Sequence, residues 1–329
     1  MKRIVSTVFC LVLMSLIATN VFAGGSREAQ PEGFRIAYIA RAQGDSFAAW
    51  LANAVVEEVA NYDNLSVTVF DGQSRNELIA DHIENAIVNQ FDLILLQPLD
   101  SVAQVAPVRE AIAAGVHVVT VNNMINDDAV PAVDAEPIDQ ARGNAEIALD
   151  QVPQGANVVV LMGPSGNMHS DQRRVGWQQF FFDQRPDVTI LDEQIAHWNK
   201  DEAMSIMEDW IQAHPQIDAV ISMNDNMAAG AIEALIDAQG PDNLPLVYGV
   251  DGTAEAALLI QDGLMTSTTL QSAYDLAEVS VRLAYDILSG AISVDYQSSR
   301  APVMIGAPLI VQNNAAEFIE MHRRAGNLR

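Results

Sequence analysis

The stretch AVISMNDNMAAGA, Ala219 to Ala231, joins two structural patterns. Its first five residues are apolar apart from one serine, as in a strand buried on both faces, and its last four are small residues typical of a packed helix. Asn224, Asp225 and Asn226 separate the two patterns. Polar residues at such a junction either cap the helix or bind a polar molecule.

The same alternation of strand and helix patterns runs through the chain from residue 34 onward. Apolar runs such as FRIAYIA (34–40) and FDLILLQP (91–98) alternate with amphipathic segments such as NELIADHIENAIVNQ (76–90). Near-continuous apolar strands between helices indicate parallel sheets covered on both faces. Because the pattern restarts after Asn122, we expect an α/β fold of two doubly wound parallel-sheet lobes. An eight-stranded barrel is the alternative, which the mid-chain break disfavours.

The first 33 residues are typical of a leader and a tether. MKR precedes an apolar segment that ends with VFA at Ala23, so residues 1–23 are interpreted as a secretory signal peptide. Residues 24–33 are polar with Gly and Pro, and we expect them to be disordered. The single cysteine, Cys10, lies inside the leader, so the mature chain is expected to fold without a disulfide.

The charge is strongly acidic. The chain has 43 Asp and Glu against 17 Lys and Arg, a net charge of −26, which becomes −28 when Lys2 and Arg3 leave with the signal peptide. Lys200 is then the only lysine. A nucleic-acid partner is not expected, because phosphate contacts need Lys and Arg. After the leader, no run of about 18 apolar residues predicts a membrane span.

Polar and aromatic side chains follow most of the predicted strands, where ligands bind in open parallel sheets. The candidate ligand-binding residues are Arg41, Asp45, Phe47, Asn122, Asn123, Arg173, Trp198, Asn224, Asp251 and Gln271. Amides, carboxylates and guanidinium groups match adjacent hydroxyls, and aromatic rings stack on sugar rings. Each residue alone is also explained as a helix cap, a turn, a core aromatic or a solvated arginine. Together they favour a site for a hydroxylated ligand.

An enzyme is the second hypothesis, and the sequence offers little for it. The chain has no G-x-G-x-x-G after a strand, no G-x-x-x-x-G-K-[ST], no H-E-x-x-H, no G-x-S-x-G and no EF-hand loop. His169, His197 and His214 are isolated in sequence, and we expect them at the surface or the rim of a site. No catalytic residue, cofactor or metal is therefore expected.

From Phe34 to Val311 the chain resembles the periplasmic sugar-binding proteins of the ribose/galactose type, the type I solute-binding proteins of ABC importers. The segments that carry the resemblance are ISMNDNMAAGAIEAL, VYGVDGT, QRRVGWQQF and FDLILLQPLDSVA. It implies a small neutral sugar as ligand, with a cyclitol or polyol as the alternative. It also implies a periplasmic monomer that serves ABC transporter permease subunits. A chemoreceptor is an alternative partner, and a sugar-responsive transcription regulator, which shares the fold, is disfavoured by the signal peptide.

The resemblance also assigns roles by position. Phe47 and Trp198 would stack on a sugar ring, while a second set would hold hydroxyls: Arg173, Asn224, Asp251 and Gln271. Asn122 and Asn123 stand where ribose binders carry an Asp–Arg pair. Arg41 and Asp45 replace small or amide side chains, and Ala48 replaces a second phenylalanine. These departures point away from ribose itself and leave the sugar class intact.

The family topology further implies three crossings between lobes, near residues 134–136, 271–273 and 304–308. The N-terminal lobe would then comprise residues 34–134 and 273–304, and the C-terminal lobe residues 135–272 and 305–329. A three-stranded hinge would join them. For the opening stretch, we expect Asn224 to point at the ligand while Asp225 or Asn226 caps the following helix.

The charge leads to a prediction about salt. With a net charge of −28 after loss of the leader, self-repulsion destabilises the folded chain, and added salt screens it. We expect the melting temperature to rise between low salt and about 1 M NaCl, where the Debye length falls to about 3 Å. A melting temperature that stays flat or decreases, measured by circular dichroism, would contradict this explanation.

Overall fold

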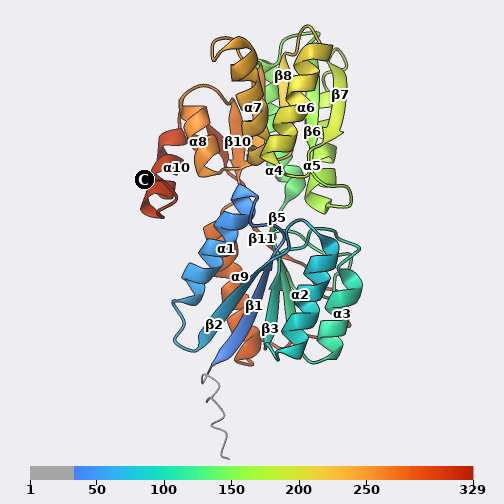
Figure 1. Ribbon diagram of the computed structural model, residues 1–329, viewed down its shortest axis with the longest axis vertical. Coiled ribbons are helices and arrows are strands. Elements are labelled where there is room, and N and C mark those ends of the chain that lie inside the picture. The colour runs from blue at the N-terminus through green and yellow to red at the C-terminus, as the bar shows by residue number, and fades with distance from the viewer. Residues whose placement is uncertain (1–32, 329) are drawn as a thin grey trace, which may run out of the picture. The chain divides into compact units, whose positions relative to one another are not determined.

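Two six-stranded sheets organise the described part of the chain. The computed structural model describes residues 33–328 (Figure 1). The predicted signal peptide, residues 1–23, and the predicted tether up to residue 32 lie outside the described residues.

The first sheet has the order β11-β5-β4-β3-β1-β2, and all its neighbouring strands are parallel. Its strands are β1 (Phe34–Ala40), β2 (Leu65–Asp71), β3 (Leu93–Leu96), β4 (His117–Val121), β5 (Ala132–Ala135) and β11 (Val303–Ile305). Helices cover it on both sides and form the N-terminal lobe with it. They are α1 (Ser46–Val59), α2 (Asn76–Val88), α3 (Val105–Ala113) and α9 (Ala273–Leu288).

The second sheet has the order β12-β10-β9-β8-β6-β7, and only the edge strand β12 is antiparallel. Its strands are β6 (Asn157–Met162), β7 (Thr189–Ile195), β8 (Ala219–Ser222), β9 (Leu246–Asp251), β10 (Ser267–Leu270) and β12 (Leu309–Val311). The helices of this C-terminal lobe are α4 (Pro137–Gln151), α5 (Met168–Trp177), α6 (Lys200–Ala213), α7 (Asp225–Gln239), α8 (Ala254–Gln261) and α10 (Ala315–Arg324), with a π-helical turn, η1 (Gln178–Phe182), after α5.

The chain passes between the sheets after β5, between β10 and α9, and between β11 and β12. The predicted fold of two parallel-sheet lobes is thus confirmed, and the barrel alternative is excluded. The residue bounds assigned to each lobe stay a prediction. Strand β5 was not predicted from the sequence, because the buried Asp134 interrupts its short apolar run.

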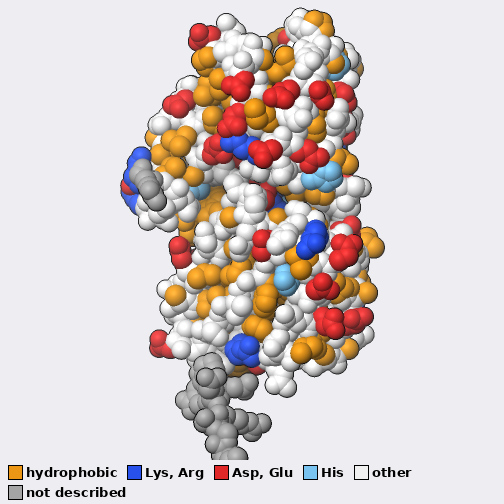
Figure 2. Space-filling model, viewed as in Figure 1, with side chains coloured by type: hydrophobic (Ala, Val, Ile, Leu, Met, Phe, Trp, Pro, Cys, Tyr) orange, Lys and Arg blue, Asp and Glu red, His pale blue; other side chains and the backbone are white. Residues whose placement is uncertain are grey.

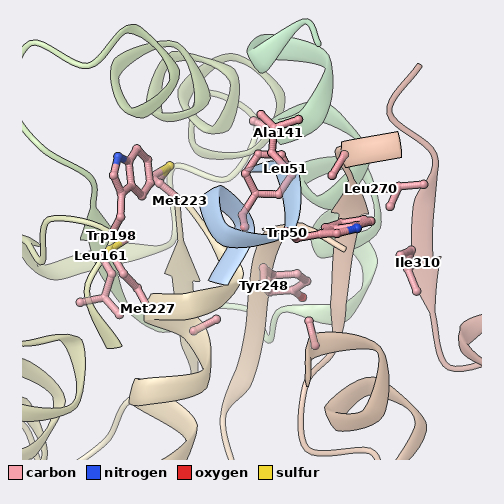
Figure 3. Close-up of a cluster of buried hydrophobic side chains, with 14 of the residues drawn as sticks. Trp50, Leu51, Ala141, Leu161, Trp198, Met223, Met227, Tyr248, Leu270 and Ile310 are labelled. Carbon is pink, nitrogen blue, oxygen red and sulfur yellow. The ribbon is translucent and has the colours of Figure 1, made fainter. Parts of the chain in front are cut away.

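Strand β1 shows why the apolar runs fold as they do. Ile36, Tyr38 and Ala40 belong to one hydrophobic cluster, while Ala37 and Ile39 belong to another. Because successive strand residues face opposite sides of a sheet, a strand that contacts helices on both sides must be apolar throughout. The larger cluster continues into the second sheet, where Leu161, Trp198, Met223 and Met227 lie together (Figure 3).

The opening stretch forms β8 and the first half of α7. Gly230 lies where α7 meets α6, and a Cβ atom at this position would lie 2.1 Å from the carbonyl oxygen of Lys200. The small residues of the stretch therefore serve close helix packing. They let α7, whose first turn follows Asn224, pack closely on α6 within the C-terminal lobe.

The surface keeps the acidic character of the sequence. Figure 2 shows Asp and Glu side chains over much of one face, with few Lys or Arg. The amine of Lys200 lies 2.7 Å from both Glu233 and Glu255, so it ties α7 and α8 to the start of α6. Within residues 33–328, no helix has the length and apolar character to cross a membrane.

Gly230 yields a prediction about stability. Glycine to alanine usually stabilises a helix by up to about 1 kcal/mol. Here we expect Gly230→Ala to destabilise the protein by about 1–3 kcal/mol, because α6 and α7 must separate to admit the methyl group. Gly44→Ala is the control, since nothing lies within 4 Å of its Cβ position. Equal unfolding free energies for the two variants in urea titrations would contradict this packing argument.

Candidate functional site

A small cavity, about 10 Å³ in volume, lies between the two lobes. Residues of both lobes line it, and none is more than 7% exposed. The lining consists of Arg41, Asn122, Asn167, His169, Arg173, Trp198, Asn224, Asp251 and Gln271. Almost wholly polar walls suit a hydrophilic molecule, which can use their hydrogen-bond donors and acceptors.

The carboxyl ends of the strands place most of these side chains. They follow or end separate strands: Arg41 follows β1, Asn122 follows β4, Trp198 comes shortly after β7, Asn224 follows β8, Asp251 ends β9 and Gln271 follows β10. Asn167 caps α5 by accepting a hydrogen bond from the Ser170 amide. Open parallel sheets bind ligands at this edge, and here the edges of two sheets face each other.

Several lining residues have unusual backbone conformations. The φ angles of Asn122, Trp198 and Asp251 are 53°, 60° and 127°. Such conformations cost on the order of 1–3 kcal/mol each for residues other than glycine and occur most often at functional sites. Gly163 makes room for Trp198, because a Cβ there would lie 2.2 Å from the indole ring.

In the N-terminal lobe, hydrogen bonds orient the amide of Asn122. Its Oδ1 accepts from Arg41 Nη1 at 3.1 Å and from Gln97 Nε2 at 2.8 Å. Arg41 Nη2 also pairs with Asp45 Oδ1 at 2.9 Å, and Asp45 caps α1 through the amide of Ala48. Both donors converge on Oδ1, and the Nδ2 donor of Asn122 has no hydrogen-bond partner among residues 33–328.

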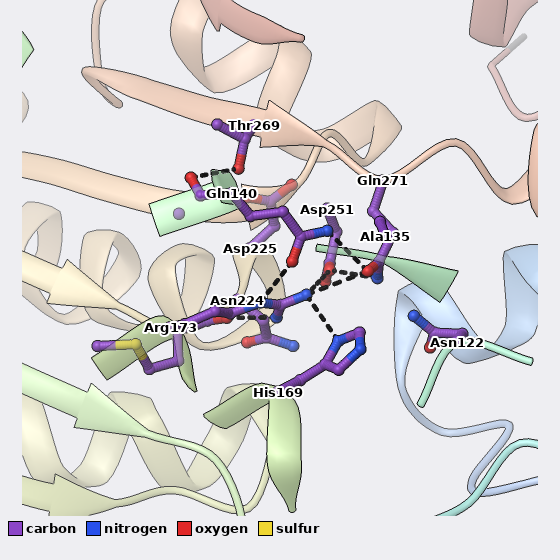
Figure 4. A network of polar contacts seen from close by, with 12 residues as sticks. Asn122, Ala135, Gln140, His169, Arg173, Asn224, Asp225, Asp251, Thr269 and Gln271 are labelled. Carbon is purple, nitrogen blue, oxygen red and sulfur yellow. Dashed lines mark hydrogen bonds and ion pairs between the residues drawn. The ribbon is translucent and has the colours of Figure 1, made fainter. Parts of the chain in front are cut away.

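In the C-terminal lobe, the guanidinium of Arg173 is held on several sides (Figure 4). Nε donates to Gln140 Oε1 at 2.9 Å and Nη1 to the Met223 carbonyl at 2.7 Å. Nη2 donates to Gln271 Oε1 and to His169 Nδ1, both at 3.2 Å. These bonds use four of the five N–H groups of the arginine, so its position is set before any ligand enters.

Burial governs the ionisation of the site. It lowers the pKa of Arg173 and raises the pKa of Asp251 well above its usual range, and the attraction between the two opposes both shifts. The pair is loose, with Nη2 of Arg173 3.7 Å from Oδ1 of Asp251. Burial also raises the pKa of Asp225 to about 7, against hydrogen bonds from Thr268 and Thr253.

Four buried polar atoms on the lining residues have no hydrogen-bond partner in the described protein. They are Arg41 Nε, Asn122 Nδ2, Trp198 Nε1 and Asp251 Oδ2. Leaving a buried polar group unpaired costs about 1–3 kcal/mol, so folded proteins rarely keep such groups without a reason. Three donors and one acceptor around one cavity match hydroxyl groups, which both donate and accept.

The lobes also contact each other directly around the cavity. Asn167 Nδ2 donates to the Leu99 carbonyl at 2.8 Å, and the Ser101 amide donates to the Gly166 carbonyl at 3.2 Å. Asn224 Nδ2 lies 3.4 Å from Asp45 Oδ2. The structure therefore has the two lobes closed on each other.

The structure brings together seven of the ten residues named from the sequence: Arg41, Asn122, Arg173, Trp198, Asn224, Asp251 and Gln271. Asp45 pairs with Arg41 and is not itself part of the cavity lining. Phe47 is fully buried and packs edge-on against Trp50 at 5.9 Å, and the amide of Asn123 bonds to Pro98 and Met124. Neither lines the cavity, and ligand contact by the ten residues stays a prediction.

Two expectations were wrong. His169 is not at the surface or rim but 4% exposed, because α5 turns it inward beside Arg173. The cap of α7 is neither Asp225 nor Asn226 but Asn224, whose Oδ1 accepts from the Met227 amide at 2.9 Å while its Nδ2 lies 3.4 Å from Asp45 Oδ2. Asn226 instead donates to the Trp198 carbonyl at 2.7 Å.

Three further residues in or beside the site were not predicted from the sequence: Asn167, Gln140 and Asp134. Asn167 could have been found, since it follows a predicted strand as the other candidates do. Gln140 and Asp134 gave no signal. The first lies within a helix and the second within a strand that was not predicted.

Comparison with known proteins agrees with this geometry. The family model described as a periplasmic binding protein domain matches residues 36–292. The chain belongs to the periplasmic binding protein family. It is 29% identical over 297 residues to the ribose import binding protein of Bacillus subtilis, covering 88% of this chain and 94% of that one. It is 30% identical over 244 residues to the xylitol-binding protein of Mycolicibacterium smegmatis, covering 73% and 67%.

A solved structure shares the fold of this periplasmic binding protein. The Caulobacter myo-inositol binding protein superposes with a TM-score of 0.80 at 24% identity, covering 91% of this chain and all of that one. These relatives are named as binding proteins. Among residues 33–328, no group of three or more His, Cys, Asp or Glu side chains is arranged to hold a metal ion.

Proposed function

We propose that this periplasmic binding protein captures one small neutral sugar in the cavity between its lobes and delivers it to an ABC importer. A cyclitol or another polyol is the alternative ligand of the same site. The single observation that carries the proposal is the set of four unpaired buried atoms on the cavity lining. Hydroxyls that both donate and accept would satisfy all four at once.

The charge balance of the cavity supports a neutral ligand. Each buried guanidinium already has a carboxylate, Asp45 for Arg41 at 2.9 Å and Asp251 for Arg173 at 3.7 Å. A charged ligand would upset this balance in a buried site, where an unpaired charge is expensive. A neutral hydroxyl instead gains hydrogen bonds to charged groups without adding a charge.

The names of related proteins support the ligand class. The relatives include ribose, xylitol and D-allose binding proteins, and structures with the same fold contain myo-inositol. The shared chemistry of these ligands is a small carbon skeleton with adjacent hydroxyls. Planar amides, carboxylates and guanidinium groups at fixed positions recognise that arrangement.

The rest of the function follows from this assignment. The chain acts as a monomer in the periplasm after loss of residues 1–23, and the three crossings between the sheets act as a hinge. Its partners are the permease subunits of the importer, with a chemoreceptor as the alternative. The protein is a carrier and not an enzyme, since the site holds its polar groups for hydrogen bonding and needs no cofactor.

A binding screen tests the proposal. We expect at least one of D-ribose, D-allose, xylitol and myo-inositol to bind wild-type protein in titration calorimetry. Asp251→Ala should weaken that binding by about 30- to 1000-fold, because the carboxyl group that hydrogen-bonds ligand hydroxyls is lost. Arg174→Ala is the matched control, as its neighbour Arg173 lines the cavity while Arg174 pairs with Glu193 at the surface.

Two results would contradict the proposal. One is the absence of binding for all four compounds at millimolar concentration. The other is a loss for Arg174→Ala that equals the loss for Asp251→Ala, which would place the site elsewhere.

A further inference from the structure

We propose that His169 is a positioning residue that holds the Arg173 guanidinium in its ligand-binding orientation, and that it does so only as a neutral imidazole. This inference rests on the proposed function, since it concerns the same cavity. It assigns a role to a residue that the resemblance to ribose binders did not single out.

The neighbours of His169 determine which ring nitrogen carries the proton. Nε2 lies 2.9 Å from both oxygens of Asp134, and a carboxylate only accepts. Nδ1 lies 3.2 Å from Nη2 of Arg173, and a guanidinium only donates. The hydrogen must therefore lie on Nε2, which leaves Nδ1 as an acceptor for the arginine.

This arrangement connects the crossing strand to the site. Asp134 is fully buried in β5, the last strand of the first sheet before the chain crosses to the second. Its Oδ1 also accepts from the Ala135 amide at 2.8 Å, which limits its rotation. His169 thus transmits the fixed position of β5 to α5, and from there to Arg173 in the C-terminal lobe.

Protonation would remove this support. A charged imidazole carries hydrogen on both nitrogens, so Nδ1–H would face the N–H of Arg173. The charged groups near the ring are Asp134 from β5, Arg173 from α5 and Arg41 from the loop after β1, with Asp251 of β9 beyond Arg173. Burial lowers the pKa of His169 below 6.5, the two arginines act in the same direction, and Asp134 opposes them.

The sign of the pH effect follows from this. Above pH 6.5 the imidazole is neutral in both the free and the liganded protein, so it adds no pH dependence. As the pH falls through the lowered pKa, the His169 imidazole becomes protonated. It must then lose this proton before Nδ1 can accept from Arg173, so the affinity for the ligand drops. When release of one proton is coupled to binding, the dissociation constant rises by up to about tenfold for each unit by which the pH falls.

The test compares variants over a pH series with the tightest binder among D-ribose, D-allose, xylitol and myo-inositol. His169→Asn keeps an acceptor near the position of Nδ1 but does not titrate, so its affinity should depend less steeply on pH than wild type. His169→Leu lacks the acceptor and should bind about 10- to 100-fold more weakly than His169→Asn at pH 8. Acid groups such as Asp251 are present in every variant and affect each pH profile alike. The difference in slope of affinity against pH between wild type and His169→Asn therefore reports on His169 alone.

The matched control is His117→Asn. Burial also lowers the pKa of His117, but its ring contacts Tyr296 in the N-terminal lobe and does not line the cavity. This variant should keep the wild-type pH profile. An identical slope for His169→Asn and wild type would overturn the inference.

Nitrogen NMR of wild-type protein without ligand gives a second readout that does not require a stable variant. It should show the His169 proton on Nε2 at pH 8, and a proton on Nδ1 would overturn the inference. If none of the four compounds binds, the proposed function fails, while this measurement still decides how His169 is held.

Discussion

The buried guanidinium of Arg173 is the group on which the site depends. It is 2% exposed and is held by neutral acceptors from α4, α5, the end of β8 and the end of β10. Taking a cation out of water is costly unless hydrogen bonds and a counter-charge compensate it. The acceptors and Asp251 provide that compensation, so the elements that carry them must meet at one point.

The same constraint explains why some polar atoms of the cavity are fixed by hydrogen bonds while others are left without a partner. Arg173 and the Oδ1 atom of Asn122 are held by protein groups, whereas Asp251 Oδ2, Trp198 Nε1 and two further atoms have no hydrogen-bond partner in the described part of the chain. A site that satisfied all its polar atoms internally would be more stable but would have nothing left for a ligand. Strained backbone at Asn122, Trp198 and Asp251 is consistent with selection for binding at the expense of stability.

The fold could be predicted from the sequence because central strands such as β1, β3, β6 and β8 are apolar on both faces, a pattern that a covered parallel sheet explains. Six of the seven cavity residues named from the sequence could be predicted because they follow or end a strand, whereas Arg173 lies within α5. Phe47 was placed by resemblance, yet it packs against Trp50, since sequence position does not determine side-chain direction. His169 and Asp134 were missed because their contact, 35 residues apart, depends on the crossing of β5 into the other lobe.

A crystal structure of the protein with a bound sugar tests the central claim most directly. The account predicts ligand oxygens within hydrogen-bond distance of Arg41 Nε, Asn122 Nδ2, Trp198 Nε1 and Asp251 Oδ2, with Arg173 in the orientation described here. A sugar bound outside the cavity, or one that leaves these four atoms without contact, would contradict it.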